Sequence, residues 1–404
     1  MNQFILGRVV PLLISLKVAA YVFYNFKMLS TLLSVGTTVI AICMLPLLIE
    51  RAGRSFKFQR LTLVFFLIAA GLVHAQFQLE NPNAIASFAL SALIVIPFLL
   101  YLELSDSSEI HRTVYLLGIW VIIKILIDFV PISMIWLMGV RADDPIVQAF
   151  LGSTPDSLMT PIHAMGGAQR ITDSGLVIFP LAFYVIREWP KLLRNICTVI
   201  IGFVIFVNFT FGVFISVFFV ISLYFLLKRK YTTLVLLMII LVGGGASLMS
   251  SDAWEVLQAD KEKSTEIKTQ QFTNTLDVFA EKPFGAGIGH YDSRLTRDYK
   301  DGNFYFENSY LFLIFAYGVF ALFPFYLIAS FAYRSARSAI RSEHSFPLAA
   351  AVVSIFVASI SNPYLFAGGV YITIYMASVA YERMDTSNNR SGSAKWMQAQ
   401  HNDL

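Results

Sequence analysis

The segment 282–291, KPFGAGIGHY, carries glycines at positions 285, 287 and 289. Glycine-rich turns of this kind bind phosphate groups in nucleotide-binding proteins, where the turn lies between a β-strand and a helix. Here residues 252–282 have a polar, helical pattern with apolar residues at intervals, and no strand pattern precedes the turn. We therefore interpret the glycines as a tight turn at the end of a helix, where glycine supplies positive φ angles.

Two pairs of charged residues have a spacing that places them on one helix face. Arg294 and Arg297 lie three residues apart, and Lys124 and Asp128 lie four apart. Lys17, Lys124 and Asp128 all fall inside apolar runs, where charge is costly and often functional. For Lys124 and Asp128 we expect a structural ion pair rather than a contact with a substrate.

The composition defines the elements that must position these residues. Of the 404 residues, 57% are hydrophobic and 14% are charged, whereas a soluble chain has about 25% charged residues. Continuous apolar runs favour helices rather than an alternating barrel, since about 20 residues cross a bilayer as a helix. We predict an all-α polytopic membrane protein. The net charge of +4 does not indicate nucleic-acid binding, and we expect no nucleic-acid partner.

The apolar runs predict twelve transmembrane helices. The expected spans are 8–25, 29–49, 61–78, 84–103, 113–139, 172–187, 195–209, 212–227, 231–249, 308–333, 346–361 and 364–381. The segment 208–212, NFTFG, divides one long run, and the Asn-Pro pair at 362–363 divides the last two spans, because a residue before proline avoids the α conformation.

Basic residues predict the orientation of the chain. Four connections, near residues 51–60, 187–194, 228–230 and 334–341, are rich in Lys and Arg and fall on the side of the N-terminus. The positive-inside rule then places both termini in the cytoplasm. The connection 104–112, LSDSSEIHR, is not basic and counts against this scheme.

The same topology leaves two long loops outside the membrane. They run over about 141–171 and 250–307, and they belong to a transmembrane domain expected over 1–383. The polar segment 384–404 is expected to be a disordered cytoplasmic tail. Long loops are usually functional, which directs attention to these two.

The second loop carries a longer pattern than its glycines. The turn at 282–291 is followed by a polar insert and then by ENSYLFLIFAYGVFALFPFYL at 307–327, and the combination resembles the O-antigen polymerase/ligase superfamily. The matching residues are Lys282, Pro283, Phe284, Gly285, Gly287, Gly289, Tyr291, Asn308, Ser309, Tyr310, Leu311, Tyr317 and Gly318. A weaker match is RITDSGLVIFPLAFYV at 170–185, although Ser174 and Gly175 replace the usual Pro-Asn pair.

The resemblance implies a C-type glycosyltransferase of the bacterial inner membrane that needs no metal and no cofactor. Its donor would be an oligosaccharide on undecaprenyl diphosphate in the bilayer. An acceptor hydroxyl would attack the anomeric carbon at the outer leaflet, and the lipid diphosphate would leave. A chain-length-regulating co-polymerase is a further partner that the sequence leaves open.

The resemblance also implies roles for particular residues. Glu307 stands where ligases of the superfamily carry histidine and is the expected base, and Arg170 is the expected catalytic arginine. The expected substrate-binding residues are Arg294, Arg297, His290, Asn308, Tyr310 and Lys268, of which Lys268 lies nearest to the arginine that many members carry. Arginine suits the diphosphate because its planar fork binds two oxygens. For each charged residue the alternative is a solvated side chain or a structural ion pair.

Three functions fit this pattern. Glu307 in place of histidine favours a polysaccharide polymerase over a ligase of the same superfamily. A flippase of lipid-linked oligosaccharide is the alternative from another class. A transporter would show paired broken helices in related halves, whereas this chain concentrates its polar sequence in two unequal outer loops, which favours an enzyme.

Overall fold

The computed structural model describes most of the chain as helices. It describes residues 2–23, 26–46, 95–141, 144–151, 159–161, 169–171, 174–208, 211–236, 239, 252–287, 292–295, 308–341, 345–360, 365, 370 and 372–381. The predicted spans 61–78 and most of 84–103 and 231–249, with the tail 384–404, lie outside these residues.

The elements follow one another along the chain with few strands among them. The helices are α1 (Asn2–Val22), α2 (Lys27–Cys43), α6 (Ser107–Met138), α7 (Pro145–Leu151), α9 (Pro180–Ile186), α10 (Lys191–Asn208), α11 (Phe211–Leu227), α13 (Asp252–Glu281), α14 (Ser309–Tyr317), α15 (Leu322–Arg341) and α16 (Phe346–Ala358). Short 3₁₀ helices are η2 (Ser174–Ile178), η3 (Ser293–Leu295) and η4 (Gly318–Ala321), and apolar helices also cover Val95–Leu104 and Ile372–Tyr381. Strands β1 (Met159–Pro161) and β2 (Gln169–Ile171) pair antiparallel.

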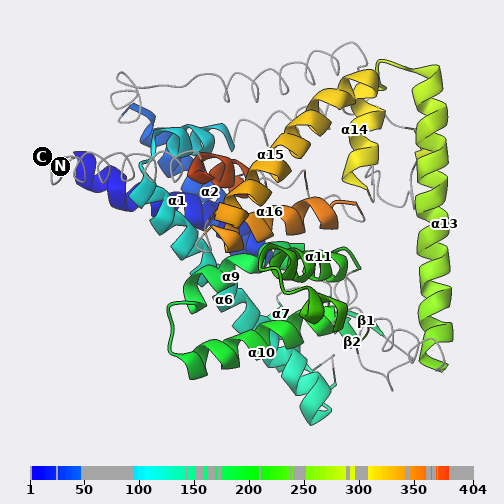
Figure 1. Ribbon diagram of the computed structural model, residues 1–404, viewed down its shortest axis with the longest axis horizontal. Coiled ribbons are helices and arrows are strands. Elements are labelled where there is room, and N and C mark those ends of the chain that lie inside the picture. Colours follow the sequence, from blue (N-terminus) through cyan, green and yellow to red (C-terminus); the bar gives the residue numbers. More distant parts are fainter. Residues whose placement is uncertain are drawn as a thin grey trace, which may run out of the picture.

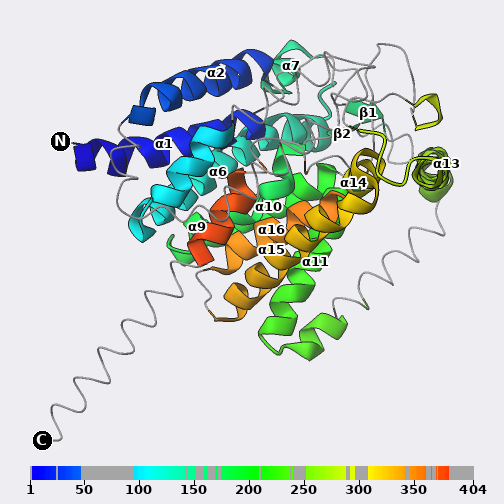
Figure 2. The same cartoon turned by 90° about the horizontal axis from the view of Figure 1, so that it is seen from above.

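Most of the helices pack side by side in one bundle, as Figures 1 and 2 show. Helix α1 packs on α2 and α6, and α16 packs on α9, α11 and α15. Small residues permit close crossings: a Cβ atom added at Gly118 of α6 would lie 2.6 Å from the Leu181 carbonyl oxygen of α9. Ala349, Ala350 and Ala351 of α16 are fully buried. The core therefore runs through the middle of the bundle.

The helices agree with a helical membrane protein, although they do not establish the number of spans. Within the described part of the chain, Ser107–Ile135 and Ser309–Ser335 are long and apolar enough to cross a bilayer, and the other apolar helices are shorter. The predicted break in the run near 208–212 is confirmed, because α10 ends at Asn208 and α11 begins at Phe211. The twelve spans and their orientation stay predictions.

Two details differ from the expected fold. The first predicted outer loop contains the β1–β2 hairpin, so the described chain is helical but not wholly α. The predicted continuous helix 308–333 is broken at Gly318, where η4 separates α14 from α15. Both differences depend on contacts between segments, and the physical reason for the break is given with the site below.

The acidic connection before α6 has a local role. The Asp106 side chain accepts a hydrogen bond from the Glu109 backbone N–H (2.8 Å), and the Glu109 carboxylate accepts one from the Asp106 N–H (2.9 Å). This reciprocal arrangement is a capping box, which stabilises the first turn of a helix. Arg112 donates to the Gly7 carbonyl oxygen (2.6 Å). The acids at 104–112 thus start helix α6.

The charges inside the apolar helices have protein partners. Lys124 Nζ lies 2.5 and 2.6 Å from the two carboxylate oxygens of Asp128, and both side chains are buried, which confirms the predicted ion pair. Lys17 donates to the Ser34 hydroxyl (2.7 Å) and the Thr38 hydroxyl (3.0 Å) of α2. The contacts of Lys17 join α1 to α2, and the Lys124–Asp128 pair lies within one turn of α6.

Candidate functional site

Helix α13 stands at the end of the molecule opposite to the N-terminus in both views (Figures 1 and 2). It contacts α14 and η3, which follow it in the chain. The β1–β2 hairpin lies on the same side of the molecule (Figures 1 and 2). Helix α13 and the β1–β2 hairpin, which come from the two predicted outer loops, therefore lie on the same side of the molecule.

The glycine turn joins α13 to the end of α14 through the backbone. Segment 283–287 exchanges three hydrogen bonds with segment 315–319, and we call this pairing the glycine clamp. The bonds are Ala286 N–H to the Phe315 carbonyl (2.8 Å), Gly287 N–H to the Ala316 carbonyl (3.1 Å) and Val319 N–H to the Pro283 carbonyl (2.8 Å). The clamp brings together the two halves of the sequence motif.

The clamp requires glycine at two positions. Gly285 has a φ of +93°, and a Cβ atom there would lie 2.6 Å from the Tyr317 carbonyl carbon. Gly318 has a φ of +56°, and its Cβ atom would lie 2.5 Å from the Phe284 carbonyl carbon. A side chain at either position would be strained and would push the segments apart. The predicted positive φ angles are confirmed at Gly285 and Gly287, and Gly289 lies outside the described residues. The same approach of backbones breaks the helix at Gly318.

A small apolar core lies beneath the clamp. Val278 of α13, Ala286 of the clamp, Leu295 of η3, and Leu311 and Phe315 of α14 are buried against one another. This cluster is separate from the main core of the bundle. We call α13, the clamp, η3 and α14 together the clamp unit.

Asn308 begins helix α14. Its side-chain oxygen accepts hydrogen bonds from the backbone N–H groups of Tyr310 (2.8 Å) and Leu311 (3.2 Å). Asparagine in this position satisfies N–H groups that have no partner within the helix. Glu307, the predicted base, directly precedes this cap but lies outside the described residues.

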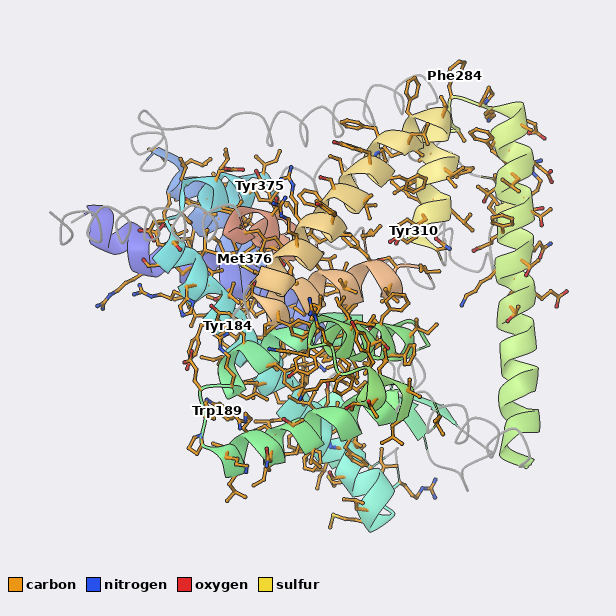
Figure 3. All side chains as sticks on the ribbon, in the orientation of Figure 1. Tyr184, Trp189, Phe284, Tyr310, Tyr375 and Met376 are labelled. Atoms are coloured by element: carbon orange, nitrogen blue, oxygen red, sulfur yellow. The ribbon has the colours of Figure 1, made fainter. Side chains whose placement is uncertain are left out.

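Ser309 and Tyr310 attach the start of α14 to the bundle. The Ser309 N–H donates to the Ser359 carbonyl (3.1 Å), and its hydroxyl accepts from the Leu365 N–H (3.3 Å). The Tyr310 hydroxyl donates to the Phe356 carbonyl at the end of α16 (2.8 Å). Figure 3 shows Tyr310 near the end of α14 that faces away from the clamp. The Asn-Ser-Tyr motif thus fixes the start of α14 against the end of α16.

Arg294 is held by two carboxylates. Its guanidinium makes two parallel bonds of 3.0 Å to Glu281 and contacts Asp292 at 2.7 Å. These bonds lower the pKa of Glu281, and the bonds to Asp292 and then to Glu281 raise the pKa of Arg294. Because two negative charges surround one positive charge, the arrangement supports a structural role for Arg294. Its predicted role in substrate binding stays a prediction.

One face of α13 binds the η3 segment. The residues of α13 that make these contacts were not predicted from the sequence. Gln271 donates to the Leu295 carbonyl (2.9 Å), and Asn274 donates to the Arg294 carbonyl. With Glu281, these positions recur at helical spacing, which is the signal that would have found them. Lys268, a predicted binding residue, lies half-buried on α13, one turn before Gln271.

The remaining predicted residues belong to other parts of the two loops. The backbone of Arg170 lies in β2, opposite Thr160 of β1, and its side chain is not among those described. His290, Arg297 and Glu307 lie outside the described residues. Of the predicted residues, the structure therefore places Asn308 and Tyr310 at the start of α14, and the clamp lies at the other end of the same helix.

Comparison with known families bears on the same region. Residues 196–326 match the model of a family described as O-antigen ligase. This match supports the O-antigen ligase and polymerase superfamily. The matched residues include α13, both halves of the clamp and α14. Comparisons with curated proteins and with solved structures gave no match.

The family match also indicates the kind of protein. Together with the apolar helices, it supports a membrane-embedded enzyme that handles lipid-linked glycans. It is coarser than the sequence-based prediction, because it does not separate a ligase from a polymerase.

Proposed function

We propose that this protein is a polysaccharide polymerase of the bacterial inner membrane. It transfers glycan from undecaprenyl diphosphate to the non-reducing end of another lipid-linked repeat unit at the outer leaflet. The observation that supports this proposal most is the glycine clamp, which unites the two halves of the motif inside the region matched by the family model.

The proposed reaction is a displacement at the anomeric carbon of the donor. The acceptor hydroxyl oxygen forms the new bond to this carbon, and the bond from the carbon to the diphosphate breaks. The diphosphate leaves with the bonding electrons, and the hydroxyl proton passes to the Glu307 carboxylate. A general base of this kind contributes about 10²- to 10⁴-fold in rate.

The chain supplies position as well as chemistry in this proposal. The cap at Asn308 and the bond from Tyr310 to the end of α16 hold the backbone directly after Glu307. We assign Asn308 and Tyr310 a positioning role through these bonds, in addition to the contacts with substrate that the sequence predicts. Arg170 is the proposed partner of the departing diphosphate, with Arg297, His290 and Lys268 as further contacts to the substrate.

A ligase is the second candidate. The description of the matching family favours it, whereas Glu307 in place of the ligase histidine favours the polymerase. A ligase would transfer the completed glycan to a lipid A core instead of to a second repeat unit. A chain-length-regulating co-polymerase would accompany only the polymerase.

A deletion strain distinguishes these functions by the glycan that accumulates. For a polymerase, we expect a single repeat unit on the lipid core. Lipid-linked polymer without transfer to the core would instead identify a ligase. Absence of surface glycan with repeat units retained at the inner leaflet would identify a flippase and would contradict the enzyme assignment. Restoration by the plasmid-borne gene is the control.

A further inference from the structure

An exposed apolar patch lies at the glycine clamp. Phe284 and Phe320 are 63% and 61% exposed, and Leu322 beside them is 68% exposed. The rings of Phe284 and Phe320 lie 6.0 Å apart between centroids, with their planes tilted by 32°. Val319, which belongs to both the clamp and η4, is also exposed. We call these four residues the phenylalanine patch.

The patch continues one face of helix α15. Leu322, Tyr326 and Tyr333 are all exposed and lie at helical spacing along this helix. Ser309–Ser335, which includes most of α15, is one of the described segments long and apolar enough to cross a bilayer. In a membrane-embedded protein, we expect an exposed apolar face on such a segment to contact lipid. Val319, three residues before Leu322, extends that face past the first residue of α15. It is followed by Phe320, whose ring lies against that of Phe284 in the clamp unit.

Phe284 has little freedom to leave this position. The residues on both sides of it belong to the clamp, through the Val319 bond to the Pro283 carbonyl and the close approach of Gly285 to Tyr317. Figure 3 shows Phe284 at the edge of the molecule, beyond the ends of α13 and α14. The ring is thus presented outward by a fixed backbone.

Charged residues lie one turn from the patch along α13. Glu281 and its partner Arg294 are exposed, and Lys282 is the residue before the clamp. An apolar ring with charged groups at this separation suits the boundary between acyl chains and headgroups, where amphipathic elements bind. A contiguous apolar surface in water would be unfavourable, and such surfaces usually mark an interaction site.

We propose that Phe284, together with Phe320, inserts into the outer leaflet of the bilayer and anchors the C-terminal end of α13 at the membrane surface. Lipid is the occupant because the patch is continuous with the exposed apolar face of α15, most of which belongs to the apolar segment Ser309–Ser335. This anchor is independent of the reaction proposed above, and it sets the depth of the clamp unit relative to the headgroups.

Depth-dependent quenching tests the anchor. Cys43 and Cys197 are replaced by serine, and a single cysteine is introduced by Phe284→Cys and labelled with an environment-sensitive fluorophore. The full chain is placed in nanodiscs that contain phosphatidylcholine with a nitroxide near the headgroup end of the acyl chain. Tyr326→Cys on α15 is the lipid reference, and Gln270→Cys on the exposed surface of α13 is the aqueous control.

We expect the probe at 284 to be quenched by the nitroxide lipid to within about twofold of the probe at 326, and several-fold more than the probe at 270. Quenching by aqueous iodide should follow the opposite order. Iodide quenching at 284 equal to that at 270 would overturn the proposal. Protection from both quenchers would also overturn it, since a protein partner or a second copy would then cover the patch.

A second labelling position in the patch ensures that the test does not depend on the Phe284→Cys variant alone. If the chain with Phe284→Cys does not accumulate, Val319→Cys carries the probe, and the same order of quenching is expected. The measurement needs no glycan substrate. Its outcome is therefore separate from that of the deletion strain.

Discussion

The bundle and the clamp unit are held together in different ways. In the bundle, α1, α6, α9 and α16 bury a large shared core, and small residues such as Gly118 permit close helix crossings. The clamp unit buries only a small cluster around Val278 and Phe315. It depends instead on three backbone hydrogen bonds, three glycines with positive φ and the ion pairs of Arg294. A large core averages over many contacts, whereas the clamp unit depends on a few specific ones.

This difference suits an element that must present residues at one end of a membrane protein. Apolar packing between helices leaves small shifts open, because dispersion contacts are individually weak. Backbone hydrogen bonds and an N-cap are directional and fix the path of the chain. Stability therefore resides in the bundle, whereas the clamp unit and the Asn-Ser-Tyr motif fix the path of the chain from Asn308 onward.

The largest expected effect is a loss of activity, without loss of protein, when Glu307 is replaced. Glu307→Gln retains size and hydrogen bonding but removes the proposed base, so polymer should fall by about 10²- to 10⁴-fold. Chain length on gels and protein abundance by immunoblot, measured in the same cells, test this. Asp301→Asn, in the same loop, is the matched control and should retain polymer. Normal chains at normal abundance from Glu307→Gln would exclude the catalytic role.

The largest expected loss of stability lies in the bundle. Lys124→Met leaves the Asp128 carboxylate buried without its ammonium partner, which should destabilise the protein by about 3–5 kcal/mol. The double variant Lys124→Met/Asp128→Leu removes both charges and should recover most of that loss. Thermal unfolding in detergent measures both. A double variant as unstable as the single variant would show that the pair has a further role in α6.

A smaller, local loss is expected in the clamp. Gly285→Ala forces a side chain into a positive-φ position against Tyr317, at a cost of about 1–3 kcal/mol. The effect should be confined to the clamp unit, with faster proteolysis or hydrogen exchange in α13 than in α16. Gly202→Ala is the control, because its Cβ atom would meet no atom within 4 Å. Equal exchange in α13 for both variants would contradict the clamp as the determinant of this region.

The smallest expected effect is a pH dependence of the η3 segment. Arg294 lowers the pKa of Glu281, so the pair contributes stability above the pKa of Glu281 in the unfolded chain, about 4.3. That contribution is lost as pH falls through the lower pKa of the folded protein. The protection of residues 292–295 from hydrogen exchange, taken relative to the intrinsic rate at each pH, should decrease below pH 4 in the wild type. Arg294→Met should show less protection at pH 7, and the protection should depend less on pH. The same pH profile in Arg294→Met as in the wild type would exclude the Glu281–Arg294 pair as its cause.

Much of the fold and part of the site followed from local sequence. The break between α10 and α11, the Lys124–Asp128 pair and the positive φ at Gly285 were all predictable, because each depends on residues a few positions apart. The membrane-embedded helical class followed from composition in the same way. Asn308 was predicted as a site residue because it belongs to the Asn-Ser-Tyr motif. Its capping role also agrees with local sequence, since asparagine is a preferred residue at the start of a helix.

The tertiary structure alone decided which distant groups meet. Arg294 was predicted to bind the substrate, and the tertiary structure added a partner that local sequence did not indicate: Glu281, 13 residues away, accepts hydrogen bonds from both of its Nη groups. The helix break at Gly318 depends on the Pro283 carbonyl and the neighbouring backbone reaching that point, which no local pattern encodes. Lys17 donates hydrogen bonds to two hydroxyl groups of α2, and not to a carboxylate. In each case a donor or a backbone surface had several possible partners of similar chemistry, and only the packing of the segments selected one.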